Sequence, residues 1–237
     1  NFGRPLLDSI NSKKKYSIIE LSSFQLEKMK DNLLDFGILL NISPDHIDHH
    51  GSFNNYLNAK NRILEANKSI TENSPFEIFK IITGNNYQGS IQLQDLINLP
   101  HRLEKIIINN RAVIINDSKS TNTDSLKYAL SKVSDDSSLH LILMGNPDKE
   151  RYDSFLLSKP QYLYICGKHA EQLSNKIDHH NKSIFKSLED TLKHINHNFS
   201  GNVEILFSPG NPSGRDYKNF EERGEHLLIL AQKIFND

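Results

Sequence analysis

An acid, a cation and a hydroxyl stand at alternate positions where a buried strand is expected to end. Asp117, Lys119 and Thr121 follow the apolar run 112–115, and the amphipathic spacing after them predicts a helix over 123–133. A loop between the end of a strand and the start of a helix presents free N–H groups and a positive dipole end to an anion. The segment therefore predicts a phosphate or carboxylate site. Helix capping is the alternative and the more frequent reason for such residues.

Two further loops are expected at the same edge of the sheet. The segment 208–214 is rich in small residues, precedes a predicted helix and offers backbone N–H groups and hydroxyls. The segment 145–149 ends in Lys149, which with Lys119 would add positive charge. A hydrogen bond to a charged group contributes roughly 1.5–3 kcal/mol, so a few of them could hold a small anionic metabolite. Solvated loop lysines are the alternative.

In the first part of the chain, an acid and a histidine follow two other apolar runs. Glu20 lies near the end of the run 16–22, and His46 follows the run 36–42. Continuous apolar runs separated by a helix, here 24–31, predict parallel strands whose ends share the edge where open α/β sheets bind ligands. Glu20 and His46 could then hold a hard divalent cation together with phosphate.

A histidine-rich stretch surrounds His46. It contains Asp45, Asp48, His49 and His50. A zinc site needs three or four ligands, and no C-x-x-C or H-E-x-x-H pattern accompanies these residues. The sequence therefore predicts that His49 and His50 belong to an exposed loop.

One lysine has the spacing of an apolar stripe. The segment 53–67 is predicted to be a helix, and Lys60 stands four residues after Tyr56 and four before Leu64. Burial disfavours a charged amine and makes it available for chemistry such as carbamylation. The alternative is that Lys60 extends from the edge of the stripe to water.

Composition narrows the class of protein. The 237 residues are enough for one large or two modest domains, and 37% hydrophobic with 24% charged residues is ordinary for a globular protein. A net charge of -1 argues against a general nucleic-acid-binding surface. The single cysteine, Cys166, cannot form an internal disulfide, and neither a membrane-spanning run nor a signal peptide is apparent. We expect a cytoplasmic protein with no membrane or nucleic-acid partner.

Strands and helices alternate regularly in the second half of the chain, which predicts a doubly wound, mostly parallel sheet. Strands are predicted at 106–108, 112–115, 139–144, 162–166, 183–186 and 203–207, and helices at 123–133, 169–177, 188–197 and 220–235. A domain boundary is expected at Leu99, because the residue before a proline is pushed to extended geometry. The preceding segment 68–98 is weakly patterned, with one strand predicted at 79–83.

Six motifs occur in the order found in Mur ligases, and the chain resembles that family over nearly its whole length. They are ELSSFQLE at 20–27, NISPDHID at 41–48, AK at 59–60, LPHR at 99–102, NDSKSTN at 116–122 and KNFEERG at 218–224. The resemblance is to the members that add glutamate. It implies an α/β fold, with a shortened Mur ligase central domain at residues 1–98 followed by a Rossmann-like C-terminal domain at residues 99–237.

The resemblance implies ATP-dependent amide ligation in peptidoglycan precursor synthesis, joining D-glutamate to UDP-N-acetylmuramoyl-L-alanine through an acyl phosphate. The implied magnesium ligands are Glu20, His46 and Lys60 as a carbamate, and the implied catalytic residues are His46, Lys60 and Lys119. The implied ATP contacts are Arg102 and Asp117. The implied substrate contacts are Asn1, Ser22 and Gln25 for the muramoyl substrate, and Thr121, Lys149, Ser213 and Phe220 for glutamate.

The chain also departs from the family pattern. The phosphate loop G-x-x-x-x-G-K-[ST] is absent, the segment between Lys60 and Pro100 is short, and Gly214 and Arg215 replace a larger apolar residue and an acid. We therefore expect a fragment without the N-terminal domain, monomeric and inactive by itself. The alternative is a non-catalytic, anion-binding Rossmann-like module. A sister ligase, such as a folylpolyglutamate synthetase, is a weaker third option.

Overall fold

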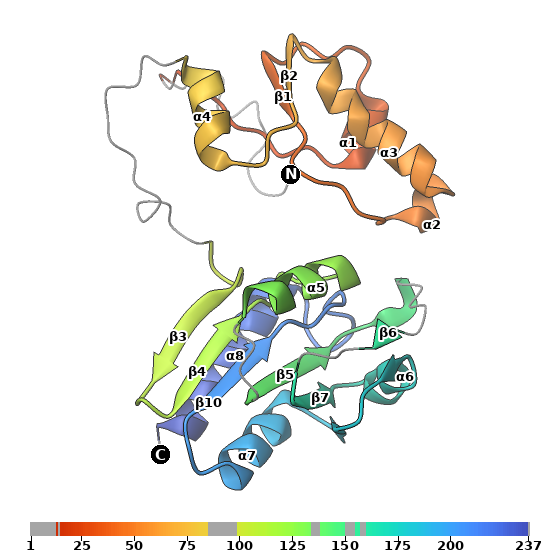
Figure 1. Ribbon diagram of the computed structural model, residues 1–237. Helices are drawn as coiled ribbons and strands as arrows, with labels where there is room; N and C mark the ends of the chain where they lie inside the picture. The colour runs from red at the N-terminus through yellow and green to blue at the C-terminus, as the bar shows by residue number, and fades with distance from the viewer. Residues whose placement is uncertain are drawn as a thin grey trace. The chain divides into compact units, whose positions relative to one another are not determined.

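The chain forms two compact units, residues 1–91 and 92–237. The computed structural model describes residues 13, 15–84, 99–133, 138–149, 155–156 and 160–236. Figure 1 labels the elements of both units, and each unit is described by itself.

The second unit is built on a six-stranded sheet. In spatial order its strands are β3 (Glu104–Ile108), β4 (Ala112–Asn116), β10 (Val203–Phe207), β5 (Leu139–Met144), β7 (Tyr162–Cys166) and β9 (Lys182–Phe185). Only the edge strand β3 runs antiparallel, as a hairpin with β4, and the other neighbours pair in parallel. The mostly parallel α/β sheet predicted from the sequence is confirmed.

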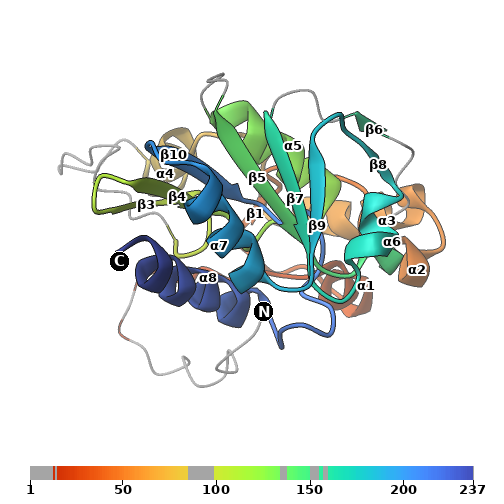
Figure 2. The same cartoon turned by 90° about the horizontal axis from the view of Figure 1, so that it is seen from below.

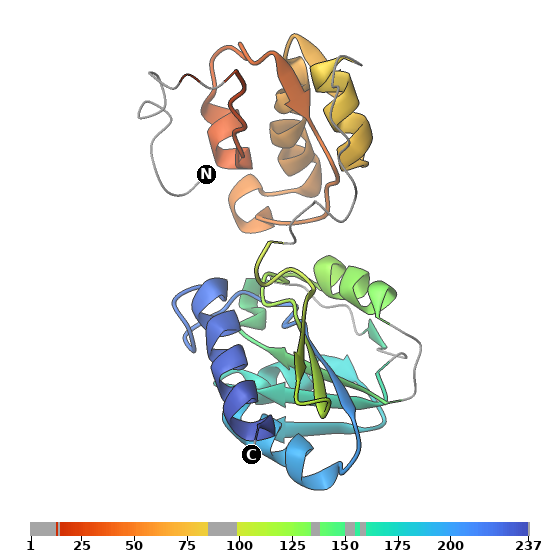
Figure 3. The same cartoon turned by 90° about the vertical axis from the view of Figure 1, so that its left-hand side faces the viewer.

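Helices cover both faces of this sheet. They are α5 (Thr123–Lys132), α6 (Ala170–Ser174), α7 (Leu188–Asn198) and α8 (Phe220–Phe235). Every residue of β5 is buried, and its side chains alternate between two cores: Leu141 packs with α5 and α6, whereas Ile142 packs with α7 and α8. Figures 2 and 3 show the sheet between these two helical layers. Burial on both faces explains why the central strands β10, β5 and β7 are mostly apolar.

Smaller elements complete the second unit. A short 3-10 helix, η4 (Pro147–Lys149), follows β5, and β6 (Phe155–Leu156) pairs in parallel with β8 (Ile177–Asp178). The last residue expected in the helix 169–177 belongs instead to β8, so that helix is shorter than predicted. Two-residue strands leave no periodic signal in a sequence, which is why β6 and β8 were not predicted.

The stability of helix α7 depends on a serine cap at its N-terminus. Its N-cap is Ser187, whose Oγ accepts a hydrogen bond from the Asp190 N–H at 3.1 Å and donates to the Asp190 carboxylate at 2.8 Å. Ser187→Ala should cost about 1 kcal/mol and lower the melting temperature by about 2–4 °C, because the cap is lost. Thermal unfolding followed by circular dichroism measures this. An unchanged melting temperature would contradict the capping role.

The first unit contains a two-stranded parallel sheet and several helices. The strands are β1 (Phe36–Ile38) and β2 (Lys68–Ile70), and the helices are α1 (Ser23–Lys28), α2 (Ile47–His50), α3 (Phe53–Asn61), the 3-10 helix η2 (Arg62–Glu65) and α4 (Pro75–Thr83). The helix predicted over 53–67 is thus divided, with its last turn in the tighter 3-10 form.

Two predictions for this unit are wrong, and a third is confirmed only in part. Residues 16–22 form no strand, and Ile18 in that run is 99% exposed. The strand expected over 36–42 is limited to β1, because its partner β2 is itself only three residues long. Residues 79–83 are helical: Ser74 caps α4 by accepting from the Glu77 N–H, and Pro75 occupies its first turn.

Candidate functional site

The three loops predicted to share one edge of the sheet do lie side by side. They follow β4, β10 and β5, which are adjacent and parallel. The Asp117 N–H donates to the Phe207 carbonyl at 2.8 Å, and the Ser208 hydroxyl donates to the Asp117 carboxylate at 2.8 Å. The Asn146 N–H donates to the Pro212 carbonyl at 3.0 Å. These bonds join the loops 116–121, 145–149 and 208–214 at the carboxyl ends of the strands, where open α/β sheets bind ligands.

A buried arginine beneath the loops holds two of them to the helix α8. Arg223 is 0% exposed, and its guanidinium donates to the Ser118 hydroxyl at 3.0 Å, the Ser118 carbonyl at 2.6 Å and the Asn211 carbonyl at 3.0 Å. Burial lowers the pKa of Arg223 to about 10, which leaves the group charged at neutral pH. The role of this residue was not predicted from the sequence. Its spacing with Leu227 and Leu230, four and seven residues later, was a usable signal of an inward position.

Two of the predicted catalytic and glutamate-contacting residues meet at this edge. The Lys119 ammonium lies 3.9 Å from the centre of the Phe220 ring, a cation–π geometry. Phe220 is the first residue of α8, whose N-cap is Asn219. Of the other two polar residues, Thr121 is half-buried and Ser213 is buried at 9% exposure. The loops therefore bring a cation, an aromatic ring and hydroxyl groups to one end of the sheet.

The loop 116–121 is also anchored to the segment that precedes β3. The Lys119 N–H donates to the His101 carbonyl at 3.0 Å, and the His101 ring lies 2.9 Å from the Asn116 amide. His101 is buried, whereas Arg102, one of the two predicted ATP contacts, is exposed. These two contacts attach the loop around Lys119 to His101.

The other predicted ATP contact, Asp117, is 8% exposed. Burial raises the pKa of its carboxyl from 3.8 to about 6, against the opposing effects of the Ser208 hydroxyl, the Leu103 N–H and the positive charges of Arg102 and Arg223. The folded protein therefore holds this proton at a pH where the unfolded chain has lost it.

This raised pKa makes stability depend on pH. Because the folded-state pKa lies above the unfolded value, the stabilisation is present below about pH 4 and is lost as the pH rises through 6. A difference of about two pKa units corresponds to about 2–3 kcal/mol. Asp117→Asn should therefore gain stability relative to the native chain between pH 4 and pH 7, measured by urea unfolding. The exposed Asp124→Asn is the control, and parallel pH profiles for Asp117→Asn and the native chain would contradict the assignment.

The predicted magnesium ligands lie in the first unit. Glu20 is exposed in the extended segment before α1. Because this segment is not a strand, Glu20 and His46 do not lie at the ends of two neighbouring strands as predicted. His46 is the N-cap of α2, with a left-handed φ of 52°, and packs against Phe24 with ring centres 5.0 Å apart. Lys60 is half-buried in the last turn of α3. Their joint role as ligands stays a prediction.

The predicted contacts with the muramoyl substrate have a local structural role. Ser22 and Gln25 form a capping box at the start of α1: the Ser22 hydroxyl accepts from the Gln25 N–H, and the side-chain Oε1 of Gln25 accepts from the Ser22 N–H at 2.9 Å. Asn1 lies outside the described residues, and Lys149 is described only as the last residue of η4. The substrate contacts of these four residues stay predictions.

The prediction that His49 and His50 form an exposed loop is wrong. Both residues belong to α2, and His50 is 8% exposed. Their rings lie beside Glu27 of α1, in the one group of acidic and histidine side chains found close enough together to hold a metal within the described parts of the chain. Neither Glu20 nor His46 belongs to that group. Over the same parts, no helix combines the length and the apolar character needed to cross a bilayer.

Comparison with known sequences points to one family. Residues 4–147 match the Mur ligase middle domain. A UDP-N-acetylmuramoylalanine--D-glutamate ligase of Buchnera aphidicola (subsp. Baizongia pistaciae) is 26% identical over 302 residues, covering 100% of this chain and 68% of the relative. The enzyme of the same name from Thermotoga maritima is 27% identical over 300 residues, again covering 100% of this chain and 68% of the relative. Both alignments are longer than the 237-residue chain, so each relative has residues that the chain lacks.

Solved structures share the fold at low sequence identity. The MurF ligase of Thermotoga maritima in complex with ADP superposes with a TM-score of 0.57 at 12% identity, over 85% of this chain and 62% of that one. The UDP-N-acetylmuramate-alanine ligase MurC of the same organism gives a TM-score of 0.54 at 10% identity, over 90% of this chain. The chain thus spans 62% of the length of either structure.

Proposed function

Because the chain belongs to the Mur ligase family, we propose that it is part of an ATP-dependent ligase that adds D-glutamate to UDP-N-acetylmuramoyl-L-alanine in the cytoplasm. The names of the relatives that align over the whole chain support this substrate pair. In this proposal residues 1–98 belong to the central domain that handles ATP, and residues 99–237 are the C-terminal domain that binds glutamate. We expect this ligase to act as a monomer.

The junction of the three loops at the end of the sheet carries the proposal. Glutamate brings two carboxylates and an amine, and in this proposal the Lys119 ammonium and the hydroxyls of Thr121 and Ser213 bind the carboxylates. The contact between Lys119 and Phe220 positions the cation at this edge, and the buried Arg223 keeps the loops in place. A carboxylate-binding pocket on a rigid sheet edge can present the amine of glutamate for reaction.

The reaction forms an amide bond from an activated acid. The amine nitrogen of glutamate attacks the carbonyl carbon of an acyl phosphate, phosphate leaves, and the nitrogen loses a proton. Lys119 would stabilise the negative charge that develops on this carbon's oxygens. The bond from its backbone N–H to the His101 carbonyl holds the loop that carries this side chain.

The donor types in the first unit fit magnesium. Glu20 offers a carboxylate, His46 an imidazole, and a carbamate on the half-buried Lys60 would add further oxygen ligands, which Mg²⁺ prefers. When bound, Mg²⁺ would neutralise charge on the phosphoryl group transferred from ATP. Arg102 and Asp117 would contact ATP in this proposal.

We expect the chain by itself not to turn over. The pattern G-x-x-x-x-G-K-[ST], whose backbone and lysine hold the phosphates of ATP in P-loop enzymes, is absent from its sequence. A chain that binds glutamate and cannot hold the triphosphate would behave as an anion-binding module, the alternative function.

Phosphate release separates these possibilities. The complete product of the gene and the 237-residue chain are each mixed with ATP, Mg²⁺, UDP-N-acetylmuramoyl-L-alanine and D-glutamate. We expect release that depends on D-glutamate from the complete product, and none from the chain. Release from neither protein, together with glutamate binding by both, would favour the module. Release that is independent of glutamate would remove the ligase assignment.

A further inference from the structure

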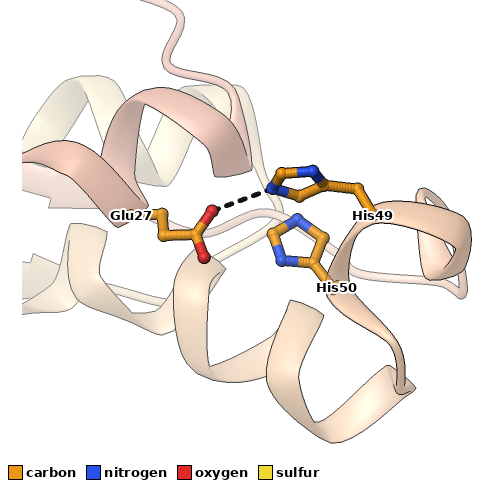
Figure 4. Close-up of side chains that lie close together, drawn as sticks. All are labelled: Glu27, His49 and His50. Carbon is orange, nitrogen blue, oxygen red and sulfur yellow. Dashed lines mark hydrogen bonds and ion pairs between the residues drawn. The ribbon is translucent and has the colours of Figure 1, made fainter.

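We propose that Glu27, His49 and His50 form a binding site for a borderline divalent transition metal of the Zn²⁺ type. Each residue offers one ligand atom, and these atoms all lie within 4.8 Å of one another. Figure 4 shows the Glu27 carboxylate facing the two imidazole rings. The site is separate from the proposed magnesium ligands and does not depend on the ligase assignment.

The ligand set has the chemistry that zinc takes in proteins. Two imidazole nitrogens and one carboxylate oxygen form a three-ligand set that leaves a fourth position for water. At zinc–ligand distances of about 2.0–2.1 Å, neighbouring ligands of a tetrahedral site are about 3.3 Å apart. The Glu27 oxygen and the His49 Nε2 are already 3.0 Å apart. The remaining adjustment is within the reach of the exposed Glu27 side chain.

The backbone that carries Glu27 is held in place. The Arg62 guanidinium donates to the Leu26 carbonyl at 2.7 Å and to the Glu27 carbonyl at 2.9 Å. These bonds add to the one that the Leu26 carbonyl accepts from the Met29 N–H, and they hold the last turn of α1. Arg62 therefore fixes the end of α1 beside the two histidines of α2.

The His50 ring contacts a buried serine, and its backbone carbonyl accepts a further hydrogen bond. Its Nε2 lies 3.0 Å from the Ser23 hydroxyl, and the Asn55 side chain donates to the His50 carbonyl at 2.9 Å. Ser23 is 1% exposed. Partners of this kind fix the orientation of metal-binding histidines.

Aromatic rings pack against the two histidines of the cluster. The Phe24 ring centre lies 4.5 Å from that of His49 and 5.7 Å from that of His50, and Tyr56 lies 5.4 Å from His50. These rings shield the buried His50, while the Glu27 and His49 side chains stay exposed to solvent. In the absence of metal, the exposed Glu27–His49 pair contributes little to stability, so coordination replaces it at small cost.

The two imidazoles determine which metal the site prefers. Two nitrogen ligands out of three favour zinc and its neighbours, whereas magnesium takes mostly oxygen ligands. We therefore expect Zn²⁺ to bind here in the presence of excess Mg²⁺. A bound ion would connect α1 to α2, two helices that the sequence separates by 18 residues between Lys28 and Ile47.

Calorimetric titration of ZnCl₂ into the metal-free chain, with MgCl₂ in large excess, tests the site. We expect one Zn²⁺ per chain, and a loss of affinity of ~10-fold or more in Glu27→Gln and in His49→Ala. Both residues are exposed, so the variants keep the fold, which circular dichroism verifies. The exposed residues Glu77 and His197 provide the matched controls Glu77→Gln and His197→Ala, which should bind Zn²⁺ like the native chain.

Two further measurements test the coordination number and the identity of the ligands. Replacing Zn²⁺ with Co²⁺ should produce the visible absorption of a four-coordinate site, and Glu27→Gln should remove it. His46→Ala should leave Zn²⁺ binding unchanged, because His46 is outside the cluster. The proposal is wrong if the native chain binds no Zn²⁺, if Glu27→Gln and His49→Ala bind it normally, or if His46→Ala abolishes binding.

Discussion

Replacing Arg223 with methionine should destabilise the second unit by about 3–5 kcal/mol, a large part of the stability of an ordinary domain. Methionine fills much of the same volume and cannot donate a hydrogen bond. The carbonyl groups of Ser118 and Asn211, both buried, would lose the guanidinium that now pairs with them. Each buried polar group left without a partner costs about 1–3 kcal/mol. Urea unfolding at neutral pH measures the loss.

Arg111→Met is the matched control. The Arg111 guanidinium also makes several hydrogen bonds, to the side chain and carbonyl of Asn196 and to the Phe199 and Ser200 carbonyls, but it is only half-buried. Water can replace those bonds, so this variant should lose about 1 kcal/mol. Equal losses in the two variants would show that the number of bonds, and not burial beneath the loops, determines the effect.

Gly145→Ala should disrupt the junction of the loops and cost about 3 kcal/mol or more. Gly145 has a φ of 109°, and a Cβ atom there would lie 2.3 Å from the Pro212 carbonyl oxygen and 3.2 Å from the Arg223 guanidinium. The loops 145–149 and 208–214 would have to separate, breaking the bond from the Asn146 N–H to Pro212. We expect lower stability and weaker D-glutamate binding, measured by urea unfolding and by calorimetry.

Gly51→Ala is the control that shows the cost of a positive φ alone, without a clash between the added Cβ atom and a neighbouring loop. Gly51 also has a positive φ, of 75°, but a Cβ atom there would meet nothing within 4 Å. Its substitution should cost about 1–2 kcal/mol through strain alone and leave D-glutamate binding unchanged. If Gly145→Ala cost no more than Gly51→Ala, the tight apposition of the two loops would not be needed for stability.

The sheet of the second unit could be predicted from the sequence because strands that are buried on both faces consist mostly of apolar residues. β5 and β7 are mostly apolar, and the polar residues that follow β4 and β10 mark the ends of those strands. Adjacent parallel strands place their following loops together, which is why the position of the site could be foreseen.

The first unit was harder to predict because its apolar runs are short and half-exposed. The run 79–83 has the composition of a strand, but the cap at Ser74 and Pro75 determines that it is helical. The run 16–22 has no partner strand in the described part of the chain, and a strand needs a partner to satisfy its backbone.

The residues that reasoning from the sequence missed depend on tertiary contacts. Glu27 and His49 are 22 positions apart, and only the packing of α1 beside α2 brings them to 3.0 Å. Arg223 was missed for another reason: an arginine in an exposed-looking KNFEERG motif is normally solvated, and its burial follows from the loops that cover it. The roles of Glu20, His46 and Lys60 still rest on the family resemblance.

Binding of D-glutamate to the loop junction is the claim on which this account depends, and it can be mapped residue by residue. We propose titrating the ¹⁵N-labelled chain with D-glutamate and following its backbone amide signals. Signals of residues 116–121 and 208–214 should shift together and saturate, while those of β1 and β2 stay still, and Lys119→Met should abolish the response. Absence of shifts in these two loops, or equal shifts in Lys119→Met, would contradict the account.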